Sequence, residues 1–467
     1  MVNVEIDREY TNLREALIKE LSGSCKLAVI QAPPGSGKTH MLLAVVSSLV
    51  REGKRVSLAA QTRRQADDIA HRWARDYGQL PAIRLGSSGS QPPDNFPLSV
   101  PWITELAALP HGPGLYISTT AKWTWVRDLE PFDVLAIDEA WQMAWGDLMQ
   151  CAKLSKKFFM IGDPGQIPPV VSVDVRRWAT APRPPHKPAP EVVLDDTELR
   201  ATAFIGSLPA CRRLPNESVK YVKPFYDFDF SAYADPNERF INLSNEHADQ
   251  QLVGIINMLS SGQPVLLTLP TPKEGLPPEV DIELTLRVEK IVRTLLTGHS
   301  QIVVGPGDKP RTIKFKDIGI CATHRAMNGE LRKALGADFS DVSIDTPERW
   351  QGLERPIMIV VHPLSNVTDP SDFDKGCTTI MIVVHPLSNV TDPSDFDLET
   401  GRLCVMASRH QVGLIVITRD HVGTSLEEFI PQASQAPGQP DVVGRGHFAH
   451  ARFWNDLVAD QRLVALT

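Results

Sequence analysis

Short apolar runs alternate with longer amphipathic segments along most of the chain, and this alternation constrains the fold more than any other feature. In the first half, runs rich in Val, Ile and Leu occupy residues 26–32, 55–61, 115–120, 132–138 and 156–162. Helical patterns near 38–51 and 63–76 separate the first three runs. Continuous apolar runs of this length are typical of strands buried on both faces, which occur in parallel sheets covered by helices. The sequence therefore predicts an α/β fold.

The same alternation returns after a proline-rich segment. Residues 179–194 read ATAPRPPHKPAPEVVL, and because proline fixes φ and removes a donor, we expect this segment to interrupt any regular element. Strand-like runs follow at 264–270, 317–323 and 412–418, with helical patterns near 281–297 and 325–335. We predict an N-terminal domain, a C-terminal domain, and a linker with a helical tail, over 1–190, 191–430 and 431–467.

Composition and charge exclude several classes of protein. Of the 467 residues, 42% are apolar and 22% are charged, as in ordinary globular proteins and unlike disordered chains. The 48 Lys and Arg against 56 Asp and Glu give a net charge of −8, so a site for a polyanion must be local. The sequence contains neither a signal-peptide pattern nor an apolar run of membrane-spanning length. The six cysteines lack zinc-type spacing, so we expect reduced thiols in a cytoplasmic protein.

One segment occurs twice, letter for letter. Residues 357–374 and 380–397 both read IMIVVHPLSNVTDPSDFD, at a spacing of 380 − 357 = 23. Solenoid units recur many times and diverge, so a recent duplication or a sequence artefact explains the copy better than repeat architecture. Since one strand position can hold only one copy, we expect the first copy to form a central strand and the second to form an edge strand or an irregular excursion.

The segment APPGSGKT, residues 32–39, follows the first strand-like run and precedes a helical pattern. This is the spacing of a phosphate-binding loop, with Ala32 in place of the usual first glycine. Its glycines permit a backbone that points N–H groups at phosphate oxygens, next to a helix N-terminus. We expect Lys38 to contact the β- and γ-phosphates and the Thr39 hydroxyl to bind Mg²⁺. The predicted nucleotide contacts in this segment are Pro34, Gly35, Ser36, Gly37, Lys38, Thr39 and His40.

Two further strand ends carry polar residues. Asp138 and Glu139 close the run at 132–138, where a buried carboxylate is costly unless it serves a cation. With a phosphate loop upstream, we expect Asp138 to hold Mg²⁺ through water and Glu139 to polarise an attacking water. Gln166 follows the run at 156–162 in a proline-rich turn, where its amide is positioned to contact the γ-phosphate.

Six segments, in order, resemble motifs of superfamily 1 helicases, especially the group that includes the nonsense-mediated-decay helicase. APPGSGKT, IDEAWQ and GDPGQIPPV resemble motifs I, II and III. ACRRLP at 210–215, SIDTPERWQGLE at 343–354 and RLCVMASRH at 402–410 resemble motifs IV, V and VI. Segments around Thr62 and Thr120 are similar to motifs Ia and Ic. The resemblance covers most of residues 25–420.

The resemblance implies two RecA-like parallel-sheet domains, with ATP in the cleft between them and a single strand of DNA or RNA across the top. It implies that Arg212 reaches the γ-phosphate and that Arg409 acts as an arginine finger. Gly352 would lie near the phosphates and Glu354 would hold the ribose. The implied nucleic-acid contacts follow strand ends: Thr62, Arg63, Thr120, Lys122 and Trp123. Trp123 either stacks on a base or packs in the core.

The leading hypothesis is an ATP-dependent translocase or helicase that acts on single-stranded nucleic acid, with a polarity of 5′ to 3′ suggested by the resemblance. REYTNLREAL at 8–17 lacks a glutamine-bearing Q motif, so other nucleoside triphosphates remain possible substrates. Short intervals between motifs leave little room for accessory insertions, which favours translocation over duplex separation. The alternative is a nucleotide-switched ATPase that binds nucleic acid or recruits partners without moving. The sequence leaves the choice of DNA or RNA, and the oligomeric state, open.

Overall fold

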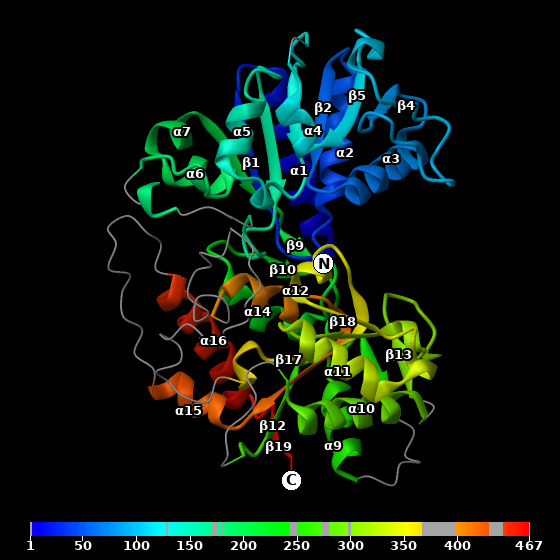
Figure 1. The fold of residues 1–467 in the computed structure, drawn as a ribbon, viewed down its shortest axis with the longest axis vertical. Coiled ribbons are helices and arrows are strands. Elements are labelled where there is room, and N and C mark those ends of the chain that lie inside the picture. Colours follow the sequence, from blue (N-terminus) through cyan, green and yellow to red (C-terminus); the bar gives the residue numbers. More distant parts are fainter. Residues whose placement is uncertain are drawn as a thin grey trace. The chain divides into compact units, whose positions relative to one another are not determined.

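The fold is described from a computed structural model (Figure 1). The structure describes residues 2–127, 129–169, 175–178, 181–242, 250–272, 280–297, 300–366, 398–428 and 442–466. The chain divides into two compact units. Unit 1 comprises Met1–Pro164 and Pro168–Ala210, and unit 2 comprises Gly165–Ile167 and Cys211–Thr467. Each unit is built around a parallel sheet, which confirms the predicted α/β class.

Unit 1 contains an eight-stranded sheet in which the paired strands run parallel. In spatial order the strands are β4 (Trp102–Ile103), β3 (Ala82–Leu85), β5 (Gly114–Thr119), β2 (Arg55–Ala60), β6 (Val134–Ile137), β7 (Phe158–Gly162), β1 (Leu27–Gln31) and β8 (Ala203–Ser207). All five strand-like runs of the first half form strands of this sheet. Its helices are α1 (Val2–Ser22), α2 (Lys38–Arg51), α3 (Arg63–Tyr77), α4 (Thr120–Trp125), α5 (Trp145–Cys151), α6 (Ala189–Asp195) and α7 (Thr197–Thr202).

Side chains of alternate strand residues pack on opposite faces of this sheet. Ala28 and Ile30 of β1 belong to a core shared with Leu17 of α1 and Leu42 of α2. Val29, between them in sequence, belongs to a second core, which includes residues of α4, α5 and α6. This alternation explains why the strands read as continuous apolar runs, because both faces are covered. The carboxyl edge of the sheet is therefore where polar loop residues gather.

The boundary between the units lies later than the sequence predicted. The segment Ala203–Ser207 forms β8, which pairs in parallel with β1, so unit 1 continues to Ala210 rather than ending at residue 190. The proline-rich segment is also less irregular than expected. Helix α6 begins inside it at Ala189, with Pro190 in the first turn. Proline is tolerated there because the first turn of a helix needs no backbone donor from that residue.

Unit 2 contains a six-stranded parallel sheet. Its order is β16 (Ser343–Asp345), β15 (Ile318–Cys321), β17 (Arg355–Val361), β18 (His410–Arg419), β12 (Val265–Leu269) and β19 (Leu463–Ala465). Two smaller sheets comprise β9 (Ala210–Cys211) with β10 (Ser231–Ala232), and β11 (Phe240–Asn242) with β13 (Gln301–Val303) and β14 (Arg311–Thr312). The helices are α8 (Asn216–Val222), α9 (Gln250–Leu259), α10 (Ile282–Thr297), α11 (Arg325–Leu335), α12 (Pro347–Trp350), α14 (Thr400–Ala407), α15 (His421–Glu428) and α16 (Val442–Ala459).

Residues 357–361 of the first copy of the duplicated segment lie in β17, which pairs on one side with β15 and on the other with β18. This confirms the expected central position of that copy. The second copy, 380–397, lies outside the described residues. The predicted tail is instead part of unit 2, because Phe453 and Leu457 of α16 are buried in its core and β19 pairs with β12. None of the helices in the described parts of the chain combines the length and apolar character needed to cross a membrane.

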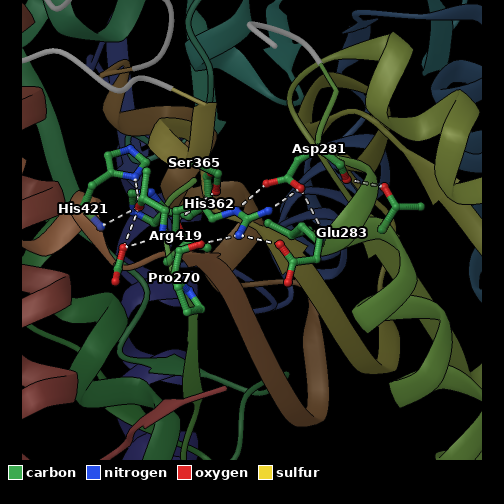
Figure 2. Close-up of polar contacts among 12 residues, drawn as sticks. Pro270, Asp281, Glu283, His362, Ser365, Arg419 and His421 are labelled. Atoms are coloured by element: carbon green, nitrogen blue, oxygen red, sulfur yellow. Dashed lines mark hydrogen bonds and ion pairs between the residues drawn. The ribbon is translucent and has the colours of Figure 1, made fainter. Parts of the chain in front are cut away.

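The carboxyl edge of the sheet in unit 2 carries a closed ionic network (Figure 2). At the end of β18, Arg419 donates from Nε and Nη2 to the two carboxylate oxygens of Asp281, each over 2.7 Å. Its Nη1 donates to the Glu283 carboxylate over 2.9 Å and also to the carbonyl of Pro270. The side chains of Arg419 and Asp281 are each only 1% exposed. The guanidinium is therefore held on all sides by groups of unit 2.

Candidate nucleotide and nucleic-acid site

The loop between β1 and α2 has the backbone that a phosphate site requires. Gly35 has φ +63° and Gly37 has φ +86°, both in the left-handed region that favours glycine. Gly37 is the N-cap of α2, and Lys38 is the first residue of that helix. The N–H groups of the first helical turn have no partners within the helix and therefore suit an anion.

Four residues predicted from separate motifs come together at the carboxyl edge of this sheet. The Lys38 ammonium nitrogen lies 3.5 Å from Glu139 Oε1, and the two side chains are 11% and 14% exposed. The Thr39 hydroxyl donates to Asp138 Oδ2 over 3.3 Å. Lys38 and Thr39 begin α2, whereas Asp138 and Glu139 follow β6. The fold thus places an ammonium, a hydroxyl and two carboxylates in one mostly buried cluster.

The charge of this cluster is incompletely balanced. Burial raises the pKa of Asp138 to about 6, and the neighbouring negative charge of Glu139 acts in the same direction, against the opposing effect of Lys38. A divalent cation bound by Thr39 and Asp138 would supply the missing positive charge. The Ser36 hydroxyl is buried, and no hydrogen-bond partner for it occurs among the described residues. These features fit a phosphate group with a divalent cation.

The backbone at Glu139 is held in an unusual conformation. Its φ of +49° lies in the left-handed region, which costs a non-glycine residue on the order of 1–3 kcal/mol. The Glu139 N–H donates to Asp138 Oδ1 over 3.0 Å, so the side chain of one acidic residue fixes the backbone of the next. Strained backbone of this kind gathers at functional sites, where the surrounding structure maintains it.

An aromatic residue of α1 lies beside the phosphate loop. The Tyr10 hydroxyl is 2.9 Å from Nδ1 of His40, in the first turn of α2. Their rings are 6.1 Å apart between centroids. Tyr10 belongs to the segment in which no Q motif is found, and sequence reasoning missed it. The only signal was its position in a helix just before the first strand.

Exposed polar and basic residues lie next to this cluster, at the ends of β2 and β5. Thr62 is the N-cap of α3 and forms a capping box with Gln65. Arg63 is exposed and its Nη2 donates to the Ser87 hydroxyl over 3.2 Å. Lys122 lies in α4 and is partly exposed. Because β5, β2 and β6 are neighbours, these residues share one sheet edge with Asp138.

Two predicted nucleic-acid contacts require correction. Trp123 is 0% exposed, donates from its indole nitrogen to the Leu58 carbonyl over 2.9 Å, and packs edge-on against Phe132. It cannot stack on a base, and the core-packing alternative is correct. Thr120 is also buried, and its hydroxyl donates to Gln61 Oε1 over 3.2 Å. In this structure the proton of that hydroxyl is therefore engaged by Gln61 and not directed at the surface. By contrast, Trp125 is 81% exposed.

In unit 2, the motif-like residues form a network of their own. The Arg212 guanidinium lies 3.8 Å from the centre of the Tyr233 ring. Arg213, its neighbour, pairs with the Glu354 carboxylate and donates to the Ser408 carbonyl over 3.1 Å. Burial alone would raise the pKa of Glu354, but the Arg213 guanidinium, the hydrogen bond from Gln411 and the charge of Arg409 together hold that pKa below its ordinary value.

The structure bears on the predicted roles of three residues in this network, Glu354, Gly352 and Arg409. Glu354 also accepts a bond from Gln411 over 2.8 Å, so both of its carboxylate oxygens have protein partners, which compete with the predicted ribose contact. Gly352 has φ +77°, a conformation that favours glycine. Arg409 is 1% exposed and follows Ser408 at the end of α14. The network thus brings the motif IV, V and VI segments together within unit 2.

The turn that carries Gln166 belongs with unit 2, which corrects its assignment to the N-terminal domain. Gln166 is buried, and a Cβ on Gly401 would lie 2.8 Å from its carbonyl carbon. The Gln351 side-chain amide donates to the Ile167 carbonyl over 3.5 Å. Within unit 2, Gln166 and Ile167 therefore lie against Gln351 of motif V and against Gly401, the residue that precedes motif VI. Among the described residues, no group of three or more His, Cys, Asp or Glu side chains is arranged to hold a metal ion.

The amino-terminal part of the chain matches a known protein family. Residues 11–187 match the family model described as an AAA domain. The chain is 28% identical over 175 residues to the DNA replication ATP-dependent helicase/nuclease DNA2 of Saccharomyces cerevisiae. It is 32% identical over 95 residues to the DNA polymerase alpha-associated DNA helicase A of Schizosaccharomyces pombe.

These matches cover limited parts of the proteins compared. The two alignments cover 36% and 18% of this chain, and only 11% and 14% of the respective relatives. Among solved structures, the helicase nonstructural protein 10 of an arterivirus aligns with 87% of this chain and 63% of its own, with a TM-score of 0.41 and 13% identity. The AAA-domain match includes the phosphate loop and both carboxylates.

Proposed function

We propose that this chain, a member of the superfamily 1 helicase-like group of P-loop proteins, is an ATP-dependent translocase or helicase that acts on single-stranded DNA or RNA. The observation that carries the proposal is the shared sheet edge in unit 1. One part of that edge holds Lys38, Thr39, Asp138 and Glu139, and the adjacent part presents exposed Thr62 and Arg63. A nucleotide and a nucleic-acid backbone would thus bind at the same carboxyl edge of one sheet.

ATP would supply the phosphoryl group and Mg²⁺ the positive charge that offsets the phosphates. The Lys38 ammonium would bind phosphate oxygens, and Thr39 with Asp138 would hold the cation. The Glu139 carboxylate lies 3.5 Å from the Lys38 ammonium nitrogen. It would accept the proton of an attacking water on Oε1 or Oε2. The roles of Gln166, Arg212 and Arg409 toward the γ-phosphate, and of Glu354 toward the ribose, stay predictions.

ATP turnover titrated with single-stranded DNA, single-stranded RNA and duplex tests this proposal. We expect Mg²⁺-dependent hydrolysis that a single strand stimulates more than a duplex does. Glu139→Gln is the variant control for contaminating ATPase, because it removes the proposed base while keeping the loop. Turnover that no nucleic acid alters, together with undetectable binding of any strand, would refute the proposal.

The alternative, a nucleotide-switched binding protein, makes a different prediction in the same assay. Such a protein would bind a strand in one nucleotide state and release it in another, with slow turnover that the strand leaves unchanged. Nucleotide-dependent binding without stimulation would therefore favour the switch over the motor.

A further inference from the structure

Gln61 bridges the two parts of the sheet edge in unit 1. It lies between the end of β2 at Ala60 and the N-cap of α3 at Thr62. Its side-chain nitrogen donates to the backbone carbonyl of Asp138 over 3.2 Å. Its side-chain oxygen accepts from the Thr120 hydroxyl over 3.2 Å. One amide group therefore connects the residue that begins α4 with the residue that follows β6.

The bond to Asp138 acts on the peptide group that leads into Glu139. This peptide is held from both sides, because Gln61 binds its carbonyl oxygen and Asp138 Oδ1 accepts from its N–H. Glu139 needs that support, since its φ of +49° is uncommon for a residue with a side chain. Gln61 thus helps to set the direction in which the Glu139 carboxylate points.

The other contacts of this segment reach the exposed part of the edge. Thr62, the next residue, caps α3 beside Arg63. Thr120 begins α4, which also carries Lys122. A strand bound at Thr62, Arg63 or Lys122 would therefore displace or fix the elements that hold Gln61 at both ends.

We propose that Gln61 is a positioning residue that makes ATP hydrolysis responsive to a bound single strand, by coupling the start of α3 and α4 to the peptide between Asp138 and Glu139. This inference rests on the proposed function. It assigns Gln61 no contact with the nucleotide, and it gives Thr120 a role through its bond to Gln61 instead of through a phosphate.

The test compares ATP turnover without nucleic acid and with saturating oligothymidylate or oligouridylate of equal length. In Gln61→Leu and Thr120→Val, we expect the ratio of stimulated to basal turnover to fall about fivefold or more, while the Kd of Gln61→Leu for the labelled strand stays within about threefold of the parent. Thr120→Ser keeps the hydroxyl and should restore the parental ratio. A variant with a general folding defect would lose strand affinity together with stimulation, and would not lower the ratio while the Kd for the strand stays unchanged.

Thr124→Val is the matched control. Thr124 is a buried threonine of the same helix, but its hydroxyl donates to the Ala121 carbonyl within α4. We expect this variant to keep the parental ratio. Full stimulation in Gln61→Leu would overturn the role of Gln61 while the proposed function stands. A parent protein that no strand binds or stimulates would overturn both.

Discussion

The two parallel sheets differ in how the buried charged side chains at their carboxyl edges are paired. In unit 2, the Arg419 guanidinium donates two hydrogen bonds of 2.7 Å each to Asp281, and its remaining nitrogen donates to Glu283 and to the Pro270 carbonyl (Figure 2). In unit 1, Lys38 and Glu139 are 3.5 Å apart, and buried Asp138 has a pKa raised to about 6, mainly by burial. In unit 2, the protein itself pairs the buried charges. In unit 1, the pairing of the buried charges is incomplete, as expected of a site that binds a charged ligand.

This difference separates a structural ion pair from a candidate active site more clearly than the number of charges does. Both edges hold buried acidic and basic groups close together. A buried ion pair whose hydrogen bonds are all made fixes the conformation of the fold. A carboxyl group with a shifted pKa, next to a lysine that is 3.5 Å from its acidic partner, is instead typical of functional sites. The following variants test this contrast.

The largest effects should come from the loose cluster in unit 1, on activity. Lys38→Ala should abolish turnover and weaken nucleotide binding, because it removes the charge that meets the phosphates. Glu139→Gln should keep nucleotide binding but lower kcat by about 10²–10⁴-fold, the usual contribution of a general base. Steady-state ATPase with a fluorescent-nucleotide binding assay distinguishes the two. Parental turnover in Glu139→Gln would show that another group activates water.

At the closed edge, the effect should fall on stability. Asp281→Asn removes a charge from the buried pair and leaves Arg419 without its main counterion, so it should lower the free energy of unfolding by about 3–5 kcal/mol. Urea denaturation measures the change. Glu283→Gln is the control and should cost much less, because that side chain is 52% exposed. Equal losses for the two variants would contradict the assigned difference between the acids.

Asp138→Asn should do the reverse and stabilise the nucleotide-free protein near neutral pH. Because the folded pKa of Asp138 is raised from 3.8 to about 6, the folded state binds more protons than the unfolded state within that window, and parental stability falls as pH rises through it. The gain from asparagine should reach up to about 3 kcal/mol above pH 6 and vanish below about pH 4. Urea midpoints measured across this range report it. A variant less stable than the parent at neutral pH would mean that Asp138 is already satisfied by Lys38.

The smallest expected effect concerns the exposed part of the edge. Arg63→Ala should weaken binding of a single strand and reduce the slope of log Kd against log salt by about 0.7, the value for one phosphate contact on a single strand. Fluorescence anisotropy over a salt series gives the slope. Arg72→Ala, an exposed arginine of the same helix that pairs with Asp68, should leave it unchanged. Equal slopes for all three proteins would remove Arg63 from the nucleic-acid contacts.

Sequence patterns predicted the strands of unit 1 and the meeting of four polar side chains at one sheet edge, for a physical reason. Parallel strands buried on both faces must be continuously apolar, and polar residues directly after them must gather at one edge. This logic brought Lys38, Thr39, Asp138 and Glu139 together. The central position of the first copy of the duplicated segment followed instead from its direct connection to the motif V residues.

Features set by neighbours in space could not be predicted in this way. Trp123 follows a strand end as the polar residues do, but its orientation within α4 turns it into the core. Arg213 and Arg212 are adjacent in sequence, and only the fold shows that Arg213 pairs with Glu354. The boundary shifted to Ala210 because β8 returns to pair with β1. The left-handed backbone at Glu139 has no sequence signal, because glutamate rarely adopts it.

Displacement of streptavidin from end-biotinylated single strands tests the central claim most directly, because it requires movement along the strand and not merely strand-stimulated hydrolysis. We expect ATP-dependent displacement from one end only, the 3′ end for the polarity suggested by the family resemblance, and none with Glu139→Gln. Strand-stimulated hydrolysis without displacement from either end would contradict a translocase and support the nucleotide-switched alternative.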